Sequence, residues 1–301
     1  MTKRIAIIGI TGQVGWELSR VCLPLGEIIP LGRDKLNLSK LDQIAAVLNE
    51  IKPDIIINAA AYTAVDIAEK EPDIAMRINA HAPAEIARYA KENDVLLVHY
   101  STDYIFDGQN TVAYSENHKP NPVNVYGKSK LKGETLIVDS GAKYIIFRTS
   151  WVFSSRGNNF LLTMLRLMRE RREIDVINDQ FGTPTWARLI AEVTGLVISK
   201  IIPQLMNESF ESGIYHVASS GKTSWNGYAK TILQLANNSI ASNKITCDVN
   251  EISTLDYPVK TARPLDTALS VSKLEGGFSL SMPNWKDCLR LCIDEMDLNK
   301  K

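Results

Sequence analysis

The sequence predicts an α/β fold, a doubly wound parallel sheet covered by helices on both faces, with a smaller α+β lobe. Three observations predict it. Short, wholly apolar runs alternate with helical periods in the first half of the chain, and a glycine-rich turn joins the first apolar run to the first helical one. After residue 152 the alternation becomes less regular. Strands that are apolar throughout are typical of a parallel sheet that is buried on both faces.

The expected elements follow these periods in chain order. Strands are expected at residues 5–8, 28–31, 54–58, 95–100 and 144–148, and helices at residues 13–24, 41–51, 72–93 and 128–139. In the second half, helices are expected at residues 159–172, 186–200, 225–237 and 283–296, strands at 174–177 and 213–217, and an irregular Pro-rich stretch at 255–266. We therefore predict a sheet domain at residues 1–152, to which segments near 186–218 return, and a lobe formed mainly by residues 153–301.

Charge and hydropathy exclude some classes of partner. The 301-residue chain carries 34 basic and 34 acidic residues, so its formal net charge is zero. We expect neither nucleic acid nor a membrane as a partner, because a neutral chain has no global field to attract them. The basic start is followed by an apolar run too short for a signal peptide, and we interpret residues 5–8 as a buried strand. We also expect no apolar stretch to approach the roughly 20 residues that span a bilayer.

The four cysteines, Cys22, Cys247, Cys288 and Cys292, contain no C-x-x-C pair. Cys288 and Cys292 lie one helical turn apart, a spacing that could serve a metal ion, but the four histidines are far away in sequence. Buried or idle thiols in a reducing compartment are the simpler interpretation. We therefore expect a cytoplasmic protein.

A glycine-rich turn follows the first predicted strand. Its spacing is Gly9-x-x-Gly12-x-x-Gly15, and it opens the helix expected at residues 13–24. Glycines permit a tight turn and a close approach of the backbone to a pyrophosphate, and the helix start supplies free N–H groups. Glycines could also serve the turn alone. On the first strand of an alternating chain, however, they predict an NAD(P)-binding domain of the Rossmann type.

The end of the second predicted strand bears on the choice of cofactor. An acidic residue there would bind the ribose hydroxyls of NAD, whereas this chain has Gly32 followed by Arg33, which suits a 2′-phosphate. Asp34 lies one residue further on, and Arg33 could instead be a solvated loop charge. We expect NADPH, with NADH as the alternative.

Three residues form a candidate catalytic set. Tyr126 and Lys130 are four residues apart, so on a helix they share one face. A nearby ammonium would lower the pKa of the phenol and let Tyr126 donate a proton near neutral pH. Thr102 follows the strand expected at residues 95–100, at the sheet edge where ligands of α/β proteins bind, and could hold a carbonyl oxygen. Taken singly, a helix cap at Thr102 and a solvated helix face would explain these residues equally well.

At these residues the chain resembles the extended short-chain dehydrogenase/reductase family and, within it, the dTDP-4-dehydrorhamnose reductases. The resemblance runs essentially from end to end. It rests on residues 11–18 (TGQVGWEL), 58–66 (NAAAYTAVD), 101–108 (STDYIFDG), 124–130 (NVYGKSK), 148–152 (RTSWV) and 178–185 (NDQFGTPT), and on the pair Arg263-Pro264. Together these strings are long and specific, unlike the glycine turn alone.

The resemblance implies roles for the residues at matching positions. Tyr126 would be the proton donor, Lys130 its partner and Thr102 the hydroxyl that orients the carbonyl. Asp103 and Trp151 would contact the sugar nucleotide, as would Thr102 and Tyr126. The residues that would bind the cofactor are Gly9, Thr11, Gly12, Gln13, Val14, Gly15, Gly32, Arg33, Ala59, Ala60, Ala61, Tyr62, Thr63, Tyr100, Tyr126 and Lys130. By themselves, Asp103 could be a turn residue and Trp151 a core aromatic.

The resemblance also bears on metal and assembly. Some members of the family bind Mg²⁺ through glutamates at a dimer interface, and Glu17 matches one such position. The other metal-binding positions cannot be assigned from the sequence. Glu17 is therefore a candidate Mg²⁺ ligand, and a homodimer is a candidate assembly.

The reaction that the resemblance implies is reduction of a nucleotide-linked ketosugar. The chain would reduce the C4 carbonyl of dTDP-6-deoxy-L-lyxo-4-hexulose (dTDP-4-keto-L-rhamnose) to dTDP-L-rhamnose, a precursor of surface polysaccharide, with NADPH or NADH. Two alternatives stay open: another sugar-nucleotide reductase or epimerase of the same fold, and a non-catalytic regulatory subunit like the methionine adenosyltransferase β-subunit. The intact Thr102, Tyr126 and Lys130 argue against the regulatory subunit, because a binding module has no evident need for an acid catalyst.

Overall fold

In the computed structural model, which describes residues 2–240, 244–258, 261–296 and 298, the first half of the chain forms most of a six-stranded sheet. From one edge to the other its strands are β10 (Gly213–His216), β5 (Lys143–Thr149), β4 (Leu96–Thr102), β3 (Ile55–Asn58), β1 (Lys3–Ile8) and β2 (Gly26–Leu31). All neighbouring strands are parallel. The predicted doubly wound α/β fold is confirmed.

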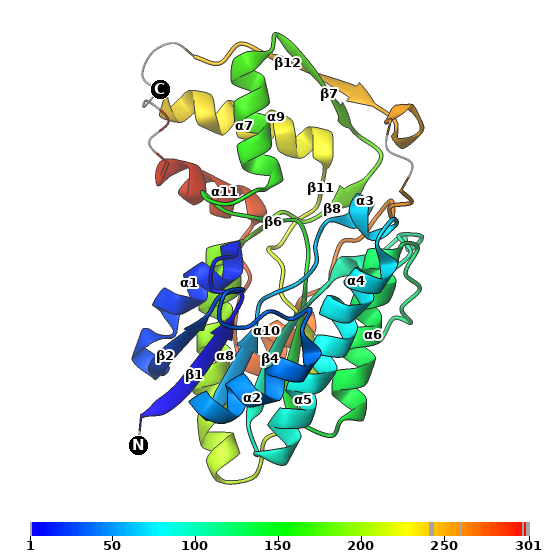
Figure 1. Ribbon diagram of the computed structural model, residues 1–301. Helices are drawn as coiled ribbons and strands as arrows, with labels where there is room; N and C mark the ends of the chain where they lie inside the picture. Colours follow the sequence, from blue (N-terminus) through cyan, green and yellow to red (C-terminus); the bar gives the residue numbers. More distant parts are fainter. Residues whose placement is uncertain (1, 241–243, 259–260, 297, 299–301) are drawn as a thin grey trace.

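Helices cover both faces of this sheet (Figure 1). On one face lie α1 (Gln13–Val21) and α8 (Ala187–Met206), and on the other lie α2 (Leu41–Ile51), α5 (Ala82–Glu92) and α6 (Val125–Asp139). Ile5 and Ile7 of β1 pack into the apolar cluster of the first face, whereas Ala6 and Ile8 pack into that of the second. Successive side chains of a strand point to opposite faces, so a strand covered on both sides is apolar at every position.

The order of the strands reverses around β1. The chain first places β2 on one side of β1 and then crosses over to place β3 on the other side. In open α/β sheets, ligands bind outside the carboxyl ends of the strands at such a reversal. The segments that follow β1 and β3, which begin at Gly9 and Ala59, border this position.

Most of the remaining elements gather beyond the carboxyl ends of the strands (Figure 1). They include α7 (Phe160–Glu170), α9 (Trp225–Ser239), α11 (Trp285–Asp294), the parallel pair β7 (Glu173–Ile177) and β12 (Asp248–Ile252), and the two-residue strands β6 (Val152–Phe153), β8 (Phe181–Gly182), β9 (Thr185–Trp186) and β11 (Thr223–Ser224). Three elements of the second half lie with the sheet instead: β10 pairs with β5, α8 packs into the cluster of the first face, and α10 (Ser272–Phe278) packs against β10. The exact division into lobes stays a prediction.

The helix predicted at residues 72–93 is interrupted. It consists of α4 (Pro72–Met76), a π-helical turn η2 (Arg77–His81) and α5. Pro83 has no N–H to donate to the carbonyl of Asn79, and in a regular α-helix its ring would clash with that carbonyl. The helix therefore widens at this point, as helices often do near functional sites.

Other differences from the predicted elements are smaller. The helix expected at residues 13–24 ends at Val21 and is followed by the 3-10 turn η1 (Leu23–Leu25). The elements that were not predicted include α3 (Val65–Ala68), α10 (Ser272–Phe278), β12 and the two-residue strands β6, β8, β9 and β11. α10 contains two adjacent glycines, and β12 carries polar or charged side chains at three of five positions, so neither shows an apolar period. The stretch expected to be irregular at residues 255–266 overlaps the 3-10 turn η4 (Thr254–Asp256), and its residues 259–260 lie outside the described residues.

One helix contradicts the expectation that no apolar stretch is long enough to cross a bilayer. α8 has 20 residues and contains an 18-residue stretch with a mean hydropathy of 1.5, so by length and composition it could span a membrane. Its apolar character has another explanation in this fold, because buried residues along much of its length pack against α1 and the first face of the sheet. Gly195 of α8 lies against Val21, and the Thr194 hydroxyl bonds to the hydroxyl of Tyr100 at 2.7 Å.

The four cysteines are free and buried, as predicted. Burial raises the pKa of Cys22 and of Cys292 to about 12, so both thiols stay protonated. Protonated buried thiols are poor nucleophiles and poor metal ligands.

Candidate active site

The glycine turn after β1 requires its glycines. Gly9 has φ +83°, and a Cβ atom at this position would lie 2.7 Å from the backbone nitrogen of Ala60. A Cβ atom at Gly15 would lie 2.1 Å from the carbonyl oxygen of Gly9. The turn therefore packs its own backbone and the backbone after β3 more closely than any side chain would allow. The predicted glycines thus allow the segment after β1 to pack closely against the segment after β3, where the order of the strands reverses.

The start of α1 fits a pyrophosphate. Gly12 is the N-cap of α1 and offers no side chain to its first N–H groups. Uncapped N–H groups and the positive end of the helix dipole favour a bound anion. Thr11 and Gly12 are exposed and Val14 is half-buried, so ligand atoms can reach the turn. These residues fit the phosphates of a dinucleotide.

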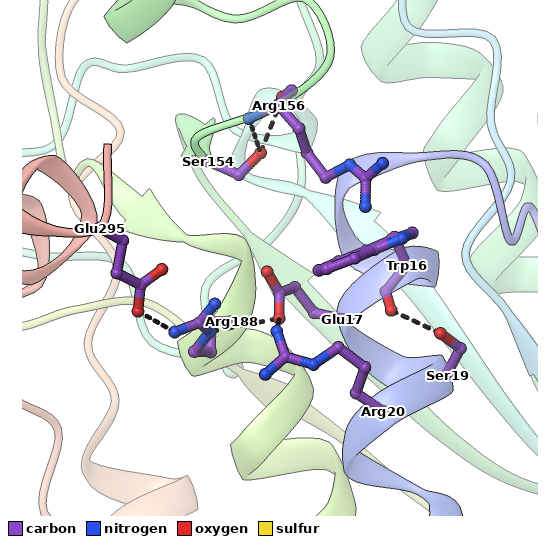
Figure 2. A network of polar contacts seen from close by, with 8 residues as sticks. All are labelled: Trp16, Glu17, Ser19, Arg20, Ser154, Arg156, Arg188 and Glu295. Atoms are coloured by element: carbon purple, nitrogen blue, oxygen red, sulfur yellow. Dashed lines mark hydrogen bonds and ion pairs between the residues drawn. The ribbon is translucent and has the colours of Figure 1, made fainter. Parts of the chain in front are cut away.

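A loop of the second lobe covers this turn. The Gln13 side-chain oxygen accepts hydrogen bonds from Ser154 Oγ at 3.0 Å and from Asn159 Nδ2 at 2.8 Å. The Arg156 guanidinium lies 3.8 Å from the centre of the Trp16 ring, in a cation–π contact. Figure 2 shows Arg156 over the ring of Trp16, close to the start of α1. The loop at residues 154–159 is thus held against the glycine turn and the start of α1.

The other residues predicted to bind the cofactor lie at the same edge of the sheet. Gly32 and Arg33 directly follow β2, and Arg33 is exposed. Ala59, Ala60, Ala61, Tyr62 and Thr63 follow β3. Asn79 holds this segment, because its side chain accepts from Tyr62 N at 2.8 Å and donates to Tyr62 O at 3.0 Å. Asn79 was not singled out from the sequence, since nothing in a helical period signals a side chain that bonds to a distant backbone.

The structure places the Thr102 hydroxyl beside Tyr126, and Lys130 on the same helix as Tyr126. Thr102 ends β4, and Tyr126 lies in the first turn of α6, one turn before Lys130. Asn124 caps this helix by accepting from the Gly127 N–H at 2.8 Å, which fixes the start of α6 beside β4. The Thr102 hydroxyl also accepts from Tyr104 N at 3.2 Å, so it is a turn cap as well as a candidate catalytic group.

The predicted effect of Lys130 on the pKa of Tyr126 is not present in this structure. Burial raises the pKa of Tyr126 to about 12, and the nearby Thr102 hydroxyl opposes this shift. Lys130 Nζ instead contacts the carbonyl oxygen of Tyr100 at 2.5 Å and His99 Nε2 at 3.2 Å. The four-residue spacing correctly predicted that Tyr126 and Lys130 share a helix face. It could not show which groups of β4 the ammonium of Lys130 would contact. The side chain of Tyr100 points away, toward Thr194 of α8.

Asp103 is buried next to the catalytic set. Its carboxylate accepts from the Thr102 hydroxyl at 3.0 Å and from the Thr267 hydroxyl at 2.5 Å. Burial raises the pKa of Asp103 to about 7, although both hydroxyls counteract it. Thr267 comes from a segment near the end of the chain and was not anticipated. The alternative interpretation of Asp103, as a turn residue alone, does not account for its buried hydrogen bond with Thr267.

We expect Asp103→Asn to remove a pH dependence of stability. The folded pKa of Asp103 lies above its unfolded value of 3.8, so the folded state loses stability as pH rises from about 4 to about 7. A shift of about 3 pKa units corresponds to about 4 kcal/mol at most. In urea unfolding at a series of pH values, the variant should gain stability over the wild type as pH rises through this window. Equal pH dependence in both proteins would contradict the assignment.

Asp107 provides a control of opposite sign. Its pKa is lowered by hydrogen bonds, first from Asn121 and then from the Gln109 N–H. Stability from such a group is present above its unfolded pKa and is lost as pH falls through the folded value. Asp107→Asn should therefore reduce stability at neutral pH rather than increase it.

Trp151 lies in a strained position. Its φ is +43°, and its ring stacks on Trp225 with ring centroids 3.4 Å apart and an angle of 5°. A Cβ atom at Gly182 would lie 2.5 Å from the Trp151 ring, so this glycine leaves the space that the ring fills. Strain of this kind is concentrated at functional sites. Trp151 is half-buried, which leaves part of its surface for a ligand.

Glu17, the candidate Mg²⁺ ligand, is already paired. Its Oε2 atom lies 3.2 Å from Arg188 Nε and 3.4 Å from Arg20 Nη1, and Arg188 also pairs with Glu295 (Figure 2). Within the described ranges of the chain, no group of three His, Cys, Asp or Glu side chains is arranged to hold a metal ion. Glu17 is buried and paired with two guanidinium groups, and Mg²⁺ at a dimer interface stays a prediction.

The chain is similar to known proteins over nearly its whole length. Residues 3–298 match the model of a family described as the RmlD substrate binding domain. A dTDP-4-dehydrorhamnose reductase of Burkholderia thailandensis is 41% identical over 294 residues, which cover 97% of this chain and 99% of that protein. One of Escherichia coli (strain K12) is 41% identical over 299 residues, with 97% of each chain covered. The solved structure of dTDP-4-dehydrorhamnose reductase from Bacillus anthracis in complex with NADP has a TM-score of 0.87 at 37% identity, covering 98% of this chain and 100% of that one.

Proposed function

The chain belongs to the dTDP-4-dehydrorhamnose reductase family, and from this premise we propose that it reduces dTDP-6-deoxy-L-lyxo-4-hexulose to dTDP-L-rhamnose with NADPH. One observation carries the proposal: Thr102 at the end of β4 and the Tyr126–Lys130 pair of α6 converge at the edge of the sheet that also carries the glycine turn. This is the set of groups that a ketone needs when it accepts a hydride and a proton.

The chain's own residues supply the acid and its surroundings. NADPH, when bound at the glycine turn, provides a hydride for C4 of the sugar. Tyr126 donates its hydroxyl proton to the oxygen at C4, and Thr102 orients that oxygen by a hydrogen bond. Lys130 returns a proton to the phenolate of Tyr126. Asp103 and the flat face of Trp151 contact the sugar nucleotide.

The experiment that tests the function is a reaction with enzymatically prepared dTDP-4-keto-L-rhamnose. The near-ultraviolet absorbance of NADPH should fall in a one-to-one ratio with the formation of dTDP-L-rhamnose. An epimerase of the same fold would reuse its cofactor and consume none. A folded protein that binds NADPH but oxidises none of it with this substrate would refute the proposed reaction.

Arg33 is the proposed contact of the 2′-phosphate that distinguishes NADPH from NADH. It is exposed just after β2 and directly follows Gly32, which stands where NAD-binding proteins carry an acidic residue. We expect Arg33→Ala to raise the KM for NADPH about tenfold, because a hydrogen bond to a charged group contributes about 1.5–3 kcal/mol. The KM for NADH should not change. Steady-state kinetics with both cofactors measure this difference.

Lys35 serves as the matched control for Arg33. It is also basic and exposed, and it lies two residues further along the same turn. Lys35→Ala should leave the KM for both cofactors within about twofold, as is typical of a screened surface charge. An equal loss in both variants would mean that general positive charge, rather than Arg33, attracts the phosphate.

The proposed function also includes a compartment, partners and an oligomeric state. We place it in the cytoplasm, where buried free thiols such as these stay reduced. We propose no nucleic acid and no membrane as a partner, since the net charge is zero and α8 is accounted for by its packing. A homodimer stays a prediction that sedimentation velocity can test. Mg²⁺ is not part of the proposal, because arginines pair with Glu17.

A further inference from the structure

Two buried side chains on adjacent strands form a chain of contacts that ends at Lys130. Asn58 Nδ2 of β3 lies 3.2 Å from His99 Nδ1 of β4, and His99 Nε2 lies 3.2 Å from Lys130 Nζ. Lys130 also donates to the carbonyl oxygen of Tyr100 at 2.5 Å. His99 is fully buried, and Asn58 and Lys130 are 1% and 2% exposed. Buried polar groups must satisfy one another, so the direction of each hydrogen bond in the chain can be worked out.

A backbone contact fixes the direction of the first hydrogen bond. The Ala60 N–H donates to Asn58 Oδ1 at 3.2 Å, so the amide nitrogen of Asn58, which can only donate, faces His99. His99 Nδ1 must then accept. A neutral imidazole carries one N–H and one acceptor nitrogen, so the proton of His99 is on Nε2 and points at Lys130. Burial, with a smaller contribution from Lys130, keeps the pKa of His99 well below its usual value, and the ring stays neutral.

The protonated form of Lys130 does not suit this arrangement. An ammonium has three donors and no acceptor, so its N–H would face the Nε2–H of His99. A neutral amine can accept that hydrogen bond through its lone pair and still donate to the Tyr100 carbonyl. We propose that Asn58 and His99 are positioning residues that favour the neutral amine of Lys130 and so make Lys130 the ready source of the proton that restores Tyr126. The proposal rests on the proposed reductase function.

The groups around Lys130 also favour its neutral amine. Burial lowers the pKa of Lys130 to about 8, opposed by the charge of Glu134 one turn further along α6. Glu134 is itself paired with Arg148, which reduces its effect. In the described part of the chain His99 on β4 is the titratable side chain that contacts Lys130, and Tyr126 lies one turn before Lys130 on α6. No carboxylate contacts the ammonium directly among these residues, so only the Tyr100 carbonyl and the charge of Glu134 favour the protonated form.

The proton balance of one turnover combines these contacts with the proposed transfer of a proton from Lys130 to Tyr126, which lies one helical turn away on α6. Tyr126 gives its proton to the oxygen at C4 and becomes a phenolate. Lys130 Nζ then gives a proton to the phenolate oxygen and becomes a neutral amine, which accepts the Nε2–H of His99 without taking that proton. Water returns a proton to Lys130. Each turnover thus takes up one proton from solvent, and Asn58 and His99 stay unchanged.

The tautomer of His99 tests the proposal directly. In the cofactor-free protein labelled with ¹⁵N-histidine, long-range proton–nitrogen correlation NMR distinguishes Nε2–H from Nδ1–H. We expect His99, assigned by its absence from His99→Gln, to be the neutral Nε2–H tautomer. The control variant His81→Gln removes an exposed histidine of η2 and should leave the His99 signal in place. An Nδ1–H tautomer or a charged imidazolium at neutral pH would overturn the proposal.

Asn58→Asp should reverse the direction of the hydrogen bonds that run from residue 58 through His99 to Lys130. A carboxylate can accept from both the Ala60 N–H and His99 Nδ1–H, which leaves Nε2 as an acceptor for an ammonium at Lys130. We expect His99 to change to the Nδ1–H tautomer, and the alkaline limb of the pH profile of kcat/KM to move up by about one pH unit. Asn93→Asp adds the same charge on the exposed surface beyond α5 and should move neither. An unchanged alkaline limb in Asn58→Asp would overturn the proposal.

Failure of the proposed reductase function and failure of the proposed roles of Asn58 and His99 give different results. The NMR measurement uses no substrate, so it reports on the Asn58–His99–Lys130 chain whether or not the protein reduces the proposed ketosugar. Absence of turnover refutes the proposed function, whereas the wrong tautomer in an active enzyme refutes this inference.

Discussion

Replacing Tyr126 with Phe is expected to lower kcat by about 10²–10⁴-fold, the usual contribution of a positioned proton donor. The substitution removes only the hydroxyl, and the ring keeps its edge contact with Tyr104, whose ring centroid lies 5.9 Å away. The fold and the cofactor turn should therefore be unaffected. Because the lost interaction is made only as the oxygen gains charge, kcat and kcat/KM should fall together. Steady-state kinetics and fluorescence titration with NADPH measure these effects.

Tyr215→Phe is the matched control for this prediction. Tyr215 lies in β10 at the edge of the sheet and packs against Phe278, with no contact to the catalytic set. Its variant should keep normal turnover. Near-normal turnover of Tyr126→Phe itself would remove Tyr126 from the mechanism, whereas a loss of NADPH binding in that variant would point to a structural role.

The largest expected effect on stability comes from the ion pair of Arg148 and Glu134. These two side chains are 3% and 2% exposed, and Arg148 contacts the carboxylate through Nε at 3.0 Å and Nη2 at 2.6 Å. Arg148→Met would leave the carboxylate buried without a partner. Breaking one side of a buried pair typically costs 3–5 kcal/mol, so we expect a loss of about 4 kcal/mol in urea unfolding at pH 7.

The double variant Arg148→Met, Glu134→Gln separates charge from packing. It removes both charges while keeping similar volumes, so most of the stability lost by the single variant should return. If the double variant is as unstable as the single one, then packing against Phe106, whose ring centre lies 5.6 Å from the guanidinium carbon, explains the loss instead.

The sequence was most informative where one local pattern decides the structure. Apolar runs located the strands because both faces of the sheet are covered, and the spacing of Tyr126 and Lys130 located their shared helix face. The interruption of the helix at Arg77–His81 was not anticipated, although Pro83 is the signal that could have indicated it. β12 was missed because its polar side chains show no apolar period.

The parts of the site that could not be predicted depend on contacts between distant segments. His99 appeared only as one residue of an apolar strand, and its role arises because β3 brings Asn58 to one side of it and α6 brings Lys130 to the other. Thr267 reaches Asp103 across 164 positions of the chain. The pKa of Tyr126 was predicted in the wrong direction because spacing gives the distance between two groups along a helix but not their burial.

The return of α8 and β10 to the sheet has a consequence for how the protein is made. When residue 152 has been synthesised, β5 still has an open edge, and the face of the sheet that α8 will cover has only α1 on it. An open strand edge and an uncovered apolar face invite association with other chains. The sheet is therefore incomplete when residue 152 has been synthesised, and it depends on about 60 further residues before α8 covers its open face and β10 pairs with β5.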